Sequence, residues 1–304
     1  MYLFSPKHLV IGGVLVMSVM LAILLLYPRT AETPSMQIET PPEISQEEKK
    51  ESPVRIVLGT SVEGREIEAY TFGAGETHLL FAGGMHGGYE WNSVLLAYQA
   101  IDYLTENPQA VPDTLSVTVI PALNPDGLFN VVGKEGRFTL ADVPKSTESV
   151  GQGRFNANGV DLNRNFDCKW QPESMWRGTK VNAGTAPFSE PEALALKEFV
   201  DESKPDAVVF WHSQANAVYA SECEKGILPA TLVLMNTYAK AAKYSAVASF
   251  DAYPVTGDAE GWLASINIPA ITVELQTHET IEWERNLAGI ISVFSQYGKS
   301  NASL

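Results

Sequence analysis

Two apolar, strand-like runs in this chain end directly on ionisable side chains. Residues 207–211 form one run that stops on His212, and residues 270–273 form another that stops on Glu274. Continuous apolar runs of this length are typical of strands buried in a parallel sheet. Ligands of such sheets bind beyond the carboxyl ends of the strands. We therefore expect the imidazole and the carboxylate to lie together at one edge of a buried sheet.

A third strand-like run, residues 79–82, breaks into a glycine turn with the sequence GGMHGGYE. His86 and Glu90 thus leave the expected sheet at the same kind of edge. Two histidines and a glutamate are a ligand set for zinc that leaves one coordination position open. A lone histidine is more often a surface or core residue, so the prediction depends on their joint occurrence at strand ends. We predict that His86, Glu90 and His212 bind one Zn²⁺ and that Glu274 is the base beside it.

Strand-like and helix-like segments alternate from Val54 onward, without a short internal repeat. This alternation predicts a single α/β domain with a mixed, mostly parallel central sheet and helices on both faces. The sequence Ser189-Glu190-Pro191-Glu192 has the pattern of a capping box, so Ser189 is expected to begin a helix. Further strands are expected at residues 54–58, 67–72, 78–83 and 115–122, helices at 91–104, 191–200, 229–244 and 280–297, and loops at 124–176 and 251–268.

The first 52 residues differ in composition from the rest of the chain. Residues 1–29 include an uncharged apolar stretch, Leu9 to Tyr27, whose length suits a bilayer crossing. We expect an uncleaved membrane anchor, and a cleaved signal peptide is the alternative. Residues 30–52 are rich in Pro, Glu, Ser and Thr and are expected to be a disordered linker. Residues 53–304 remain for the folded domain.

Cysteine usage and charge bear on location and partners. Cys168 and Cys223 are the only cysteines of the 304-residue chain and are expected to form a disulfide, with two free thiols as the alternative. Together with the anchor, they predict a domain outside the cytoplasm, periplasmic or extracellular, or secreted if the segment is cleaved.

The formal net charge of -15 argues against a nucleic-acid partner, because such binding requires Lys and Arg to neutralise phosphates.

A second signal lies in the block GVDLNRNF, which contains Asn163 and Arg164. A guanidinium beside an amide can hold a carboxylate by paired hydrogen bonds, which a lysine cannot imitate. The alternative is an arginine that pairs with a structural aspartate. Arg154, in the preceding stretch GRFNAN, is a cation that can face a developing oxyanion.

These pieces together resemble the zinc carboxypeptidase family typified by carboxypeptidase A, over roughly Val54 to the C-terminus. The matching motifs are HGGYE at 86–90, NPDG at 124–127, GVDLNRNF at 159–166, His212-Ser213, and ITVEL at 271–275. The resemblance implies zinc ligation by His86, Glu90 and His212. It also implies that Glu274 is the general base that activates water.

The same resemblance assigns substrate-binding roles. Asn163 and Arg164 match the pair that holds the terminal carboxylate of a peptide, and Tyr253 matches a mobile tyrosine that covers it. Arg154 matches the oxyanion arginine, for which Arg137 is the alternative. In one departure from the family pattern, the first motif has one residue more between His and Glu than the usual His-x-x-Glu. Two glycines make this longer turn sterically acceptable.

The loop after Tyr253 normally shapes the pocket for the last side chain of the substrate. Here it carries Asp258 and Glu260, which can pair with Lys, Arg or the distal amine of diaminopimelate; a solvated acidic loop is the alternative. The expected function is therefore a zinc metallocarboxypeptidase that acts on peptides with a free C-terminal carboxylate, cell-wall peptides among them. The alternatives are an N-acyl amino acid deacylase with the same fold and a non-catalytic module that binds peptide termini.

Overall fold

The computed structural model describes residues 52–145 and 151–299. The anchor expected in residues 1–29 lies outside the described residues, as does the linker up to residue 51. Within the two described ranges, no helix has the length and apolar character needed to cross a membrane.

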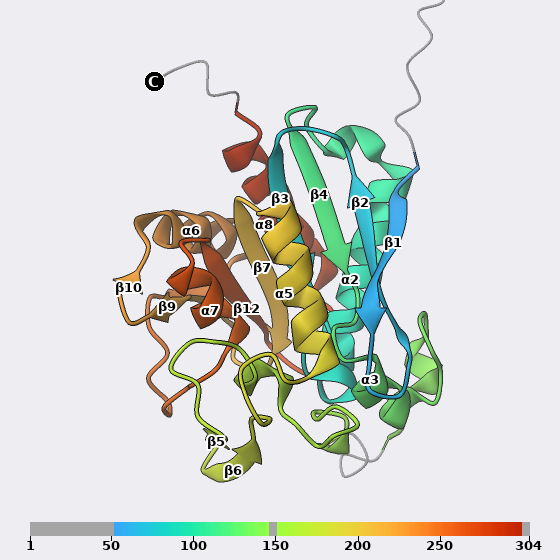
Figure 1. Ribbon diagram of the computed structural model, residues 1–304. Coiled ribbons are helices and arrows are strands. Elements are labelled where there is room, and N and C mark those ends of the chain that lie inside the picture. Colours follow the sequence, from blue (N-terminus) through green and yellow to red (C-terminus); the bar gives the residue numbers. More distant parts are fainter. Residues whose placement is uncertain (1–51, 146–150, 300–304) are drawn as a thin grey trace, which may run out of the picture. The chain divides into compact units, whose positions relative to one another are not determined.

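A mixed eight-stranded sheet forms the centre of the domain, with the order β1-β2-β4-β3-β7-β12-β8-β11 (Figure 1). The four inner strands β4, β3, β7 and β12 are parallel to one another, while β1, β2 and β8 each pair antiparallel with a neighbour. The strands are β1 (Val54–Thr60), β2 (Glu66–Phe72), β3 (Thr77–Ala82), β4 (Leu115–Ile120), β7 (Ala207–Ser213), β8 (Ala217–Ala220), β11 (Ser245–Val247) and β12 (Ala270–Leu275). The predicted α/β fold class is confirmed.

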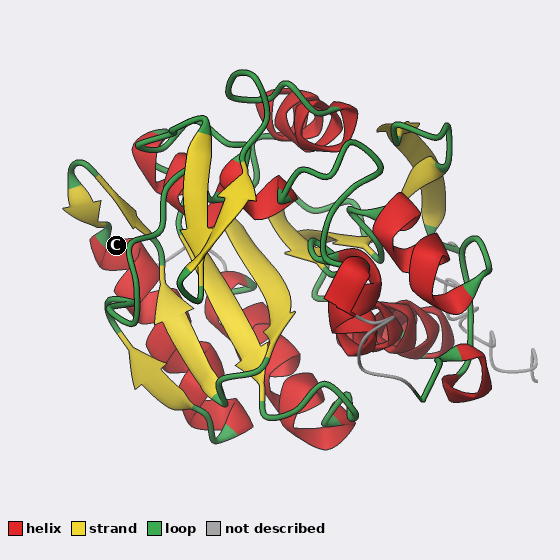
Figure 2. Cartoon of the chain, turned by 90° about the horizontal axis from the view of Figure 1, so that it is seen from below, coloured by secondary structure: helices red, strands yellow, loops and turns green. Residues whose placement is uncertain are grey.

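Helices cover both faces of this sheet (Figures 1 and 2). One face packs against α2 (Trp91–Glu106), α6 (Pro229–Ala242) and α8 (Trp283–Tyr297). The other packs against α5 (Pro191–Ser203) and α7 (Ala259–Ser265). Smaller elements include the helix α3 (Pro125–Val132) and the short 3₁₀ turn η1 (Gly87–Glu90). Two small hairpins are formed by β5 (Glu173–Trp176) with β6 (Thr179–Asn182) and by β9 (Glu222–Cys223) with β10 (Gly226–Ile227).

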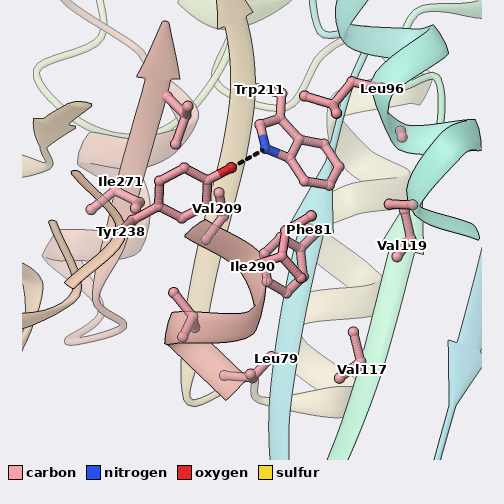
Figure 3. Packing of buried hydrophobic residues seen from close by; sticks show 14 of the residues in the cluster. Leu79, Phe81, Leu96, Val117, Val119, Val209, Trp211, Tyr238, Ile271 and Ile290 are labelled. Carbon is pink, nitrogen blue, oxygen red and sulfur yellow. Dashed lines mark hydrogen bonds between the residues drawn. The ribbon is translucent and has the colours of Figure 1, made fainter. Parts of the chain in front are cut away.

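The alternation of side chains along β7 divides the core into two clusters. Val209 and Trp211 belong to the cluster on the α2, α6 and α8 side, where the Trp211 indole donates a 3.1 Å hydrogen bond to the Tyr238 hydroxyl (Figure 3). Val208 and Phe210 belong to the cluster on the α5 and α7 side. Because successive strand residues point to opposite faces, the residue after Trp211 must face α7.

Three local predictions were wrong. The expected loop at 124–176 contains the helix α3 and the strand β5. The N-cap of α5 is Glu190 rather than Ser189, and it makes no side-chain cap hydrogen bond. The Ser189 hydroxyl donates to Glu190 Oε1 and accepts from Asn165, so tertiary partners compete successfully with the local cap. The expected loop at 251–268 contains α7, a seven-residue helix whose N-cap, Asp258, accepts from the backbone N–H of Gly261.

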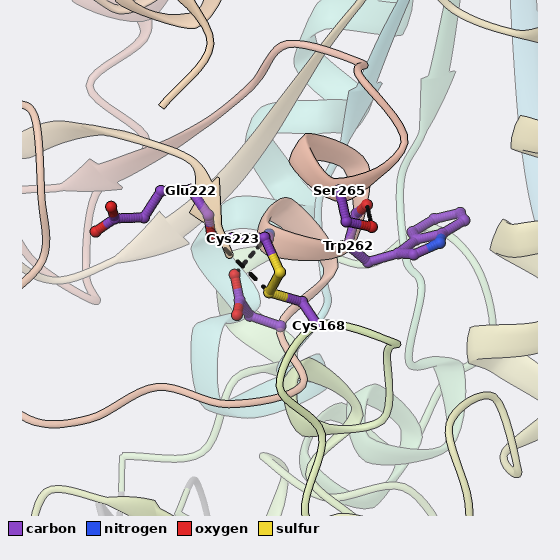
Figure 4. The surroundings of a disulfide bond; sticks show 7 residues. Cys168, Glu222, Cys223, Trp262 and Ser265 are labelled. Carbon is purple, nitrogen blue, oxygen red and sulfur yellow. Dashed lines mark hydrogen bonds between the residues drawn. A yellow bond between two sulfur atoms is a disulfide. The ribbon is translucent and has the colours of Figure 1, made fainter. Parts of the chain in front are cut away.

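The predicted disulfide between Cys168 and Cys223 is present, with a Cα–Cα distance of 6.0 Å (Figure 4). It joins the segment after GVDLNRNF to strand β9, and both cysteines are buried in the same cluster as Trp262 of α7. At Gly261 a Cβ atom would lie 2.9 Å from the Cys168 sulfur, so glycine is required where α7 meets the disulfide. The bond therefore supports the helix that carries Glu260.

Candidate active site

The ends of β7 and β12 place His212 beside Glu274. The two strands are parallel neighbours, and these two residues are direct partners in the register. Ile271, Val273 and Leu275 of β12 pack into the cluster on the α2 side, so the intervening Glu274 faces α7, as His212 does. The sequence prediction that both groups share one edge of the sheet is confirmed.

The glycine turn after β3 brings a second imidazole and a carboxylate to the same edge. A Cβ at Gly87 would lie 2.7 Å from the Gly153 carbonyl oxygen, and one at Gly88 would lie 2.4 Å from the Val131 side chain. Only glycine permits this close packing. The extra residue of the motif is accommodated in η1, which returns Glu90 to a buried position near His86.

Candidate ligand atoms of His86, Glu90 and His212 all lie within 4.8 Å of one another, and the three side chains are buried. His212 Nδ1 is 2.9 Å from Glu90 Oε2, so Nδ1 is the nitrogen that faces the cluster. Within the described part of the chain, His86 Nδ1 is buried without a hydrogen-bond partner, and Asp161 Oδ1 lies 3.5 Å from it. Two imidazoles and a carboxylate thus converge with nitrogen and oxygen atoms that are free to bind a metal ion. This set of residues fits a zinc ion.

The electrostatics of the two imidazoles favour a cation between them. Burial lowers the pKa of His86 well below its usual value, and the charge of Arg154 lowers it further, so the ring is neutral and can donate a lone pair. Burial opposes charge on His212, but Glu90 and Glu260 raise its pKa well above the usual range. The carboxylates around His212 therefore attract a positive charge, either a proton or a metal ion.

Glu274 has the properties of a base held ready for a proton. Its Oε2 atom is shielded from solvent and has no hydrogen-bond partner among the described residues. Burial raises its pKa to about 8, and the nearby charge of Glu90 adds to the effect. A cation bound by the adjacent ligand cluster would oppose this shift, because an opposite charge favours the ionised carboxylate.

Arg154 lies at the site, whereas Arg137 does not. The Arg154 guanidinium is buried, bonds Asp161 Oδ2 at 2.9 Å and 2.8 Å, and lies 4.3 Å from the centre of the Trp176 ring. Arg137 is half-exposed and pairs with Asp102 on the surface. Geometry therefore favours Arg154 as the cation that can stabilise an oxyanion.

Asp161 is a site residue that the sequence prediction did not single out, although it lies in the GVDLNRNF block. Its Oδ1 atom is 3.5 Å from His86 Nδ1 while its Oδ2 atom holds Arg154. It is fully buried. The Asp161 carboxylate thus contacts both the candidate ligand His86 and Arg154, and it can orient both side chains.

Asn163 and Arg164 are buried and line the same cavity as the histidines. The Arg164 guanidinium donates to the Met175 carbonyl oxygen at 3.3 Å and 3.2 Å, which fixes its plane. Asn163 Oδ1 accepts from the Ala259 N–H at 2.8 Å. The two side chains are therefore held by the protein and present fixed donors to the cavity.

The two acids of the α7 loop have different surroundings. Glu260 is buried; its Oε1 atom accepts from Thr272 Oγ1 at 3.0 Å, and its Oε2 atom accepts from Asn163 Nδ2 at 3.2 Å. Asp258 caps α7, and burial together with the charge of Glu260 raises its pKa to about 6. Both residues line the cavity. Glu260 is therefore buried rather than part of a solvated loop, whereas Asp258 is partly exposed.

The cavity has a volume of about 640 Å³, which is within the usual range for small-ligand sites. Tyr253 lines it and stacks edge-on against Phe250. Every site residue predicted from the sequence, except the rejected alternative Arg137, lines this one cavity. Lining residues to which the sequence prediction gave no role include Tyr89, within the HGGYE motif, and Trp176, Arg177 and His278, which lie outside the quoted motifs.

Known proteins resemble this chain in sequence and in fold. The sequence profile of the zinc carboxypeptidase family matches residues 45–287. The chain is 25% identical over 240 residues to gamma-D-glutamyl-L-diamino acid endopeptidase 1 of Lysinibacillus sphaericus, across 72% of this chain and 59% of that protein. It is 30% identical over 131 residues to murein peptide amidase A of Escherichia coli (strain K12), across 40% of this chain and 50% of the amidase. It thus spans about half the length of the curated relatives that it matches.

Solved structures resemble the domain as a whole. Murein-tripeptide amidase from Escherichia coli O157 aligns with a TM-score of 0.58 and 25% identity, across 79% of this chain and 92% of that chain. Carboxypeptidase A from Helicoverpa armigera aligns with a TM-score of 0.64 and 16% identity, across 83% of this chain and 69% of that chain. Because the identity to the Helicoverpa armigera enzyme is 16%, this similarity shows a shared fold and no more.

Proposed function

The chain belongs to the zinc carboxypeptidase family, and on that premise we propose that it hydrolyses the peptide bond before a C-terminal residue that has a free carboxylate. The observation that carries this proposal is the convergence in one cavity of the cluster His86, Glu90 and His212 with Glu274 and the buried pair Asn163-Arg164. A peptidase of this kind needs a set of metal ligands, a general base and side chains that bind the terminal carboxylate, all within reach of one substrate.

The proposed roles follow from where the groups lie. Zinc held by the cluster supplies Lewis-acid chemistry. Glu274 Oε2, which has no protein partner, takes the proton of the attacking water and returns it to the leaving amine. The Arg154 guanidinium stabilises the negative charge that develops on the scissile carbonyl oxygen. Asn163 and Arg164 bind the terminal carboxylate.

We further propose that the released residue has a cationic side chain, such as a diamino acid of a cell-wall peptide. Asp258 and Glu260 put two acids in the cavity; burial and then the charge of Glu260 raise the pKa of Asp258, although Glu260 itself lies 3.3 Å from His212 Nε2. A bound amine would relieve the repulsion between the two acids. The names of two relatives, a diamino acid endopeptidase and a murein peptide amidase, support the same substrate class.

The proposed location of the domain is outside the cytoplasm, where the Cys168–Cys223 disulfide would persist. The apolar stretch from Leu9 to Tyr27 would anchor the chain to the membrane. Extraction of membrane and soluble fractions, with protease added to intact cells, tests both points. A full-length protein found only in the soluble cytoplasmic fraction would remove this proposal.

A set of matched substrates tests the function. We expect the purified protein to release terminal Lys or diaminopimelate from a free-acid peptide, to cleave the amidated counterpart far more slowly, and to prefer the basic terminus over Leu. Asp258→Asn should reduce the preference for Lys over Leu. Faster hydrolysis of an N-acyl amino acid than of any peptide would favour the deacylase alternative. Binding of the free-acid peptide without cleavage would favour the non-catalytic module.

A further inference from the structure

His212 has two ring nitrogens with different neighbours. Nδ1 faces Glu90 in the ligand cluster, at 2.9 Å. Nε2, on the far side of the ring, lies 3.3 Å from Glu260 Oε1, and no other described carboxylate is paired with it. Nε2 is buried and makes no aligned hydrogen bond in this geometry. A buried ring nitrogen that faces a carboxylate is a strong candidate for the N–H that fixes the tautomer.

Glu260 is itself held in place from several sides. Thr272 Oγ1, on β12, donates to its Oε1 atom at 3.0 Å, and Asn163 Nδ2 donates to its Oε2 atom at 3.2 Å. Its helix is capped by Asp258 and rests at Gly261 against the disulfide. The Glu260 carboxylate therefore has little conformational freedom, and it can orient the side chains that it contacts.

We propose that Glu260 is a positioning residue that holds the His212 ring and the Asn163 amide in register with each other. In this arrangement Glu260 Oε1 accepts the Nε2 proton of His212, so that the Nδ1 lone pair is directed toward the ligand cluster. Glu260 Oε2 accepts one N–H of the Asn163 amide, and the Ala259 N–H binds the amide oxygen. The second N–H of Asn163 is then directed to a substrate carboxylate.

This inference rests on the proposed function for the roles of His212 and Asn163, but it assigns Glu260 a task that does not depend on the substrate side chain. The two tasks are compatible, because each carboxylate oxygen can accept two hydrogen bonds and Oε2 accepts only one from the protein. Substitution of a carboxylate that orients a metal-binding histidine typically lowers metal affinity or activity by roughly 10- to 100-fold.

Zinc alone is the probe for the test, so that no substrate enters the measurement. The zinc dissociation constant of the full-length protein is measured by competition with a chelator for wild type, Glu260→Gln, Thr272→Val and Asp258→Asn. Absorption spectra of the cobalt-substituted proteins report the geometry of the metal site independently. Asp258→Asn is the matched control: it removes one acid from the same loop, keeps an N-cap residue, and touches no ligand.

We expect Glu260→Gln to raise the zinc dissociation constant roughly 10- to 100-fold and to change the cobalt spectrum. Thr272→Val removes one donor to Glu260 without altering charge, and it should produce a smaller change in the same direction. On a Leu-terminated free-acid peptide, Glu260→Gln should also raise KM, because the single amide oxygen of Gln cannot accept from His212, Thr272 and Asn163 together. Asp258→Asn should leave zinc affinity and the cobalt spectrum at wild-type values.

Wild-type zinc affinity in Glu260→Gln, with only the preference for basic termini lost, would overturn the inference and leave the proposed function intact. An equal loss of affinity in Asp258→Asn would also overturn it, since the effect would then be one of net charge. If Glu260→Gln does not fold, unchanged zinc affinity and an unchanged cobalt spectrum in Thr272→Val decide against it. A wild-type protein that binds no zinc would remove the proposed function and the inference together.

Discussion

Glu274 and His212 are register partners on the adjacent parallel strands β12 and β7, and both face α7. A shift of either strand by one residue would turn its ionisable group into the apolar cluster on the other side of the sheet. Burial of Val273 and Trp211 in that cluster opposes such a shift. The packing of the core therefore sets the distance between the proposed base, Glu274, and the candidate metal ligand His212.

Removal of His212 should abolish zinc binding. Purified wild type is expected to contain one zinc per chain, and His212→Ala is expected to lose most of it, because two protein ligands remain. Elemental analysis of both proteins checks the expectation. His78→Ala is the control, since His78 lies on β3 and contacts Thr118 rather than the cluster. Full zinc occupancy in His212→Ala would exclude it as a ligand.

Glu274→Gln should retain zinc and lose most turnover. The amide cannot accept a proton from water, and general-base contributions are typically on the order of 10²- to 10⁴-fold. Measurement of kcat alongside zinc content separates loss of the base from loss of the metal. A variant with near wild-type kcat would rule out this role.

The metal-free protein should lose stability as pH rises. Glu274 has a folded-state pKa of about 8 against an ordinary value of 4.5, so folding retains a proton that the unfolded chain releases. Its stabilising contribution is full below the ordinary pKa and is lost as pH rises to the folded value. Glu274→Gln removes this dependence, so the variant should gain stability relative to wild type between about pH 5 and about pH 8.5. Thermal melts of both metal-free proteins at these pH values are the measurement, and a constant difference would contradict the expectation.

Replacement of both Cys168 and Cys223 by serine should destabilise the domain by about 4 kcal/mol, from the chain entropy of a loop with a sequence separation of 55. Urea unfolding of wild type and the double variant gives the difference. Alkylation without reductant provides the control, because wild type should expose no free thiol. A loss below about 1 kcal/mol would show that the bond contributes little to folding.

Arg164→Lys should impair cleavage of free-acid peptides far more than cleavage of amidated ones. An ammonium group cannot reproduce the planar pair of donors that a guanidinium presents to a carboxylate. The ratio of kcat/KM for the two substrates should therefore fall toward one. Arg137→Lys, on the surface pair with Asp102, is the matched control and should keep the wild-type ratio. Equal losses on both substrates for Arg164→Lys would refute carboxylate binding by Arg164.

Much of the site was predictable because its signals are local. His212 and Glu274 end apolar runs. Because side chains alternate along a strand, the strand period determines the face of the sheet to which each of them points. His86 and Glu90 are close in the chain, and the glycines between them permit a turn that returns the carboxylate to the cluster. The α/β class followed from the alternation of strands and helices.

Other features depended on contacts between distant segments. The stretch GRFNAN favoured Arg154 over Arg137, but only the fold shows that Arg154 is buried against Asp161 while Arg137 pairs with Asp102 on the surface. Helix α7 was missed because it is short: its sequence supplies the N-cap Asp258, but its stability depends mainly on packing against the sheet and the disulfide.

The sequence by itself determined which side chains have the chemistry of a zinc peptidase and that they emerge at strand ends, because residue type and strand period are local properties. Only the tertiary structure decided that Glu260 lies against His212 Nε2 and Asn163 Nδ2. That contact requires α7 to pack beside β7 and β12, and the free energy for such packing comes from apolar burial over the whole domain rather than from any one motif.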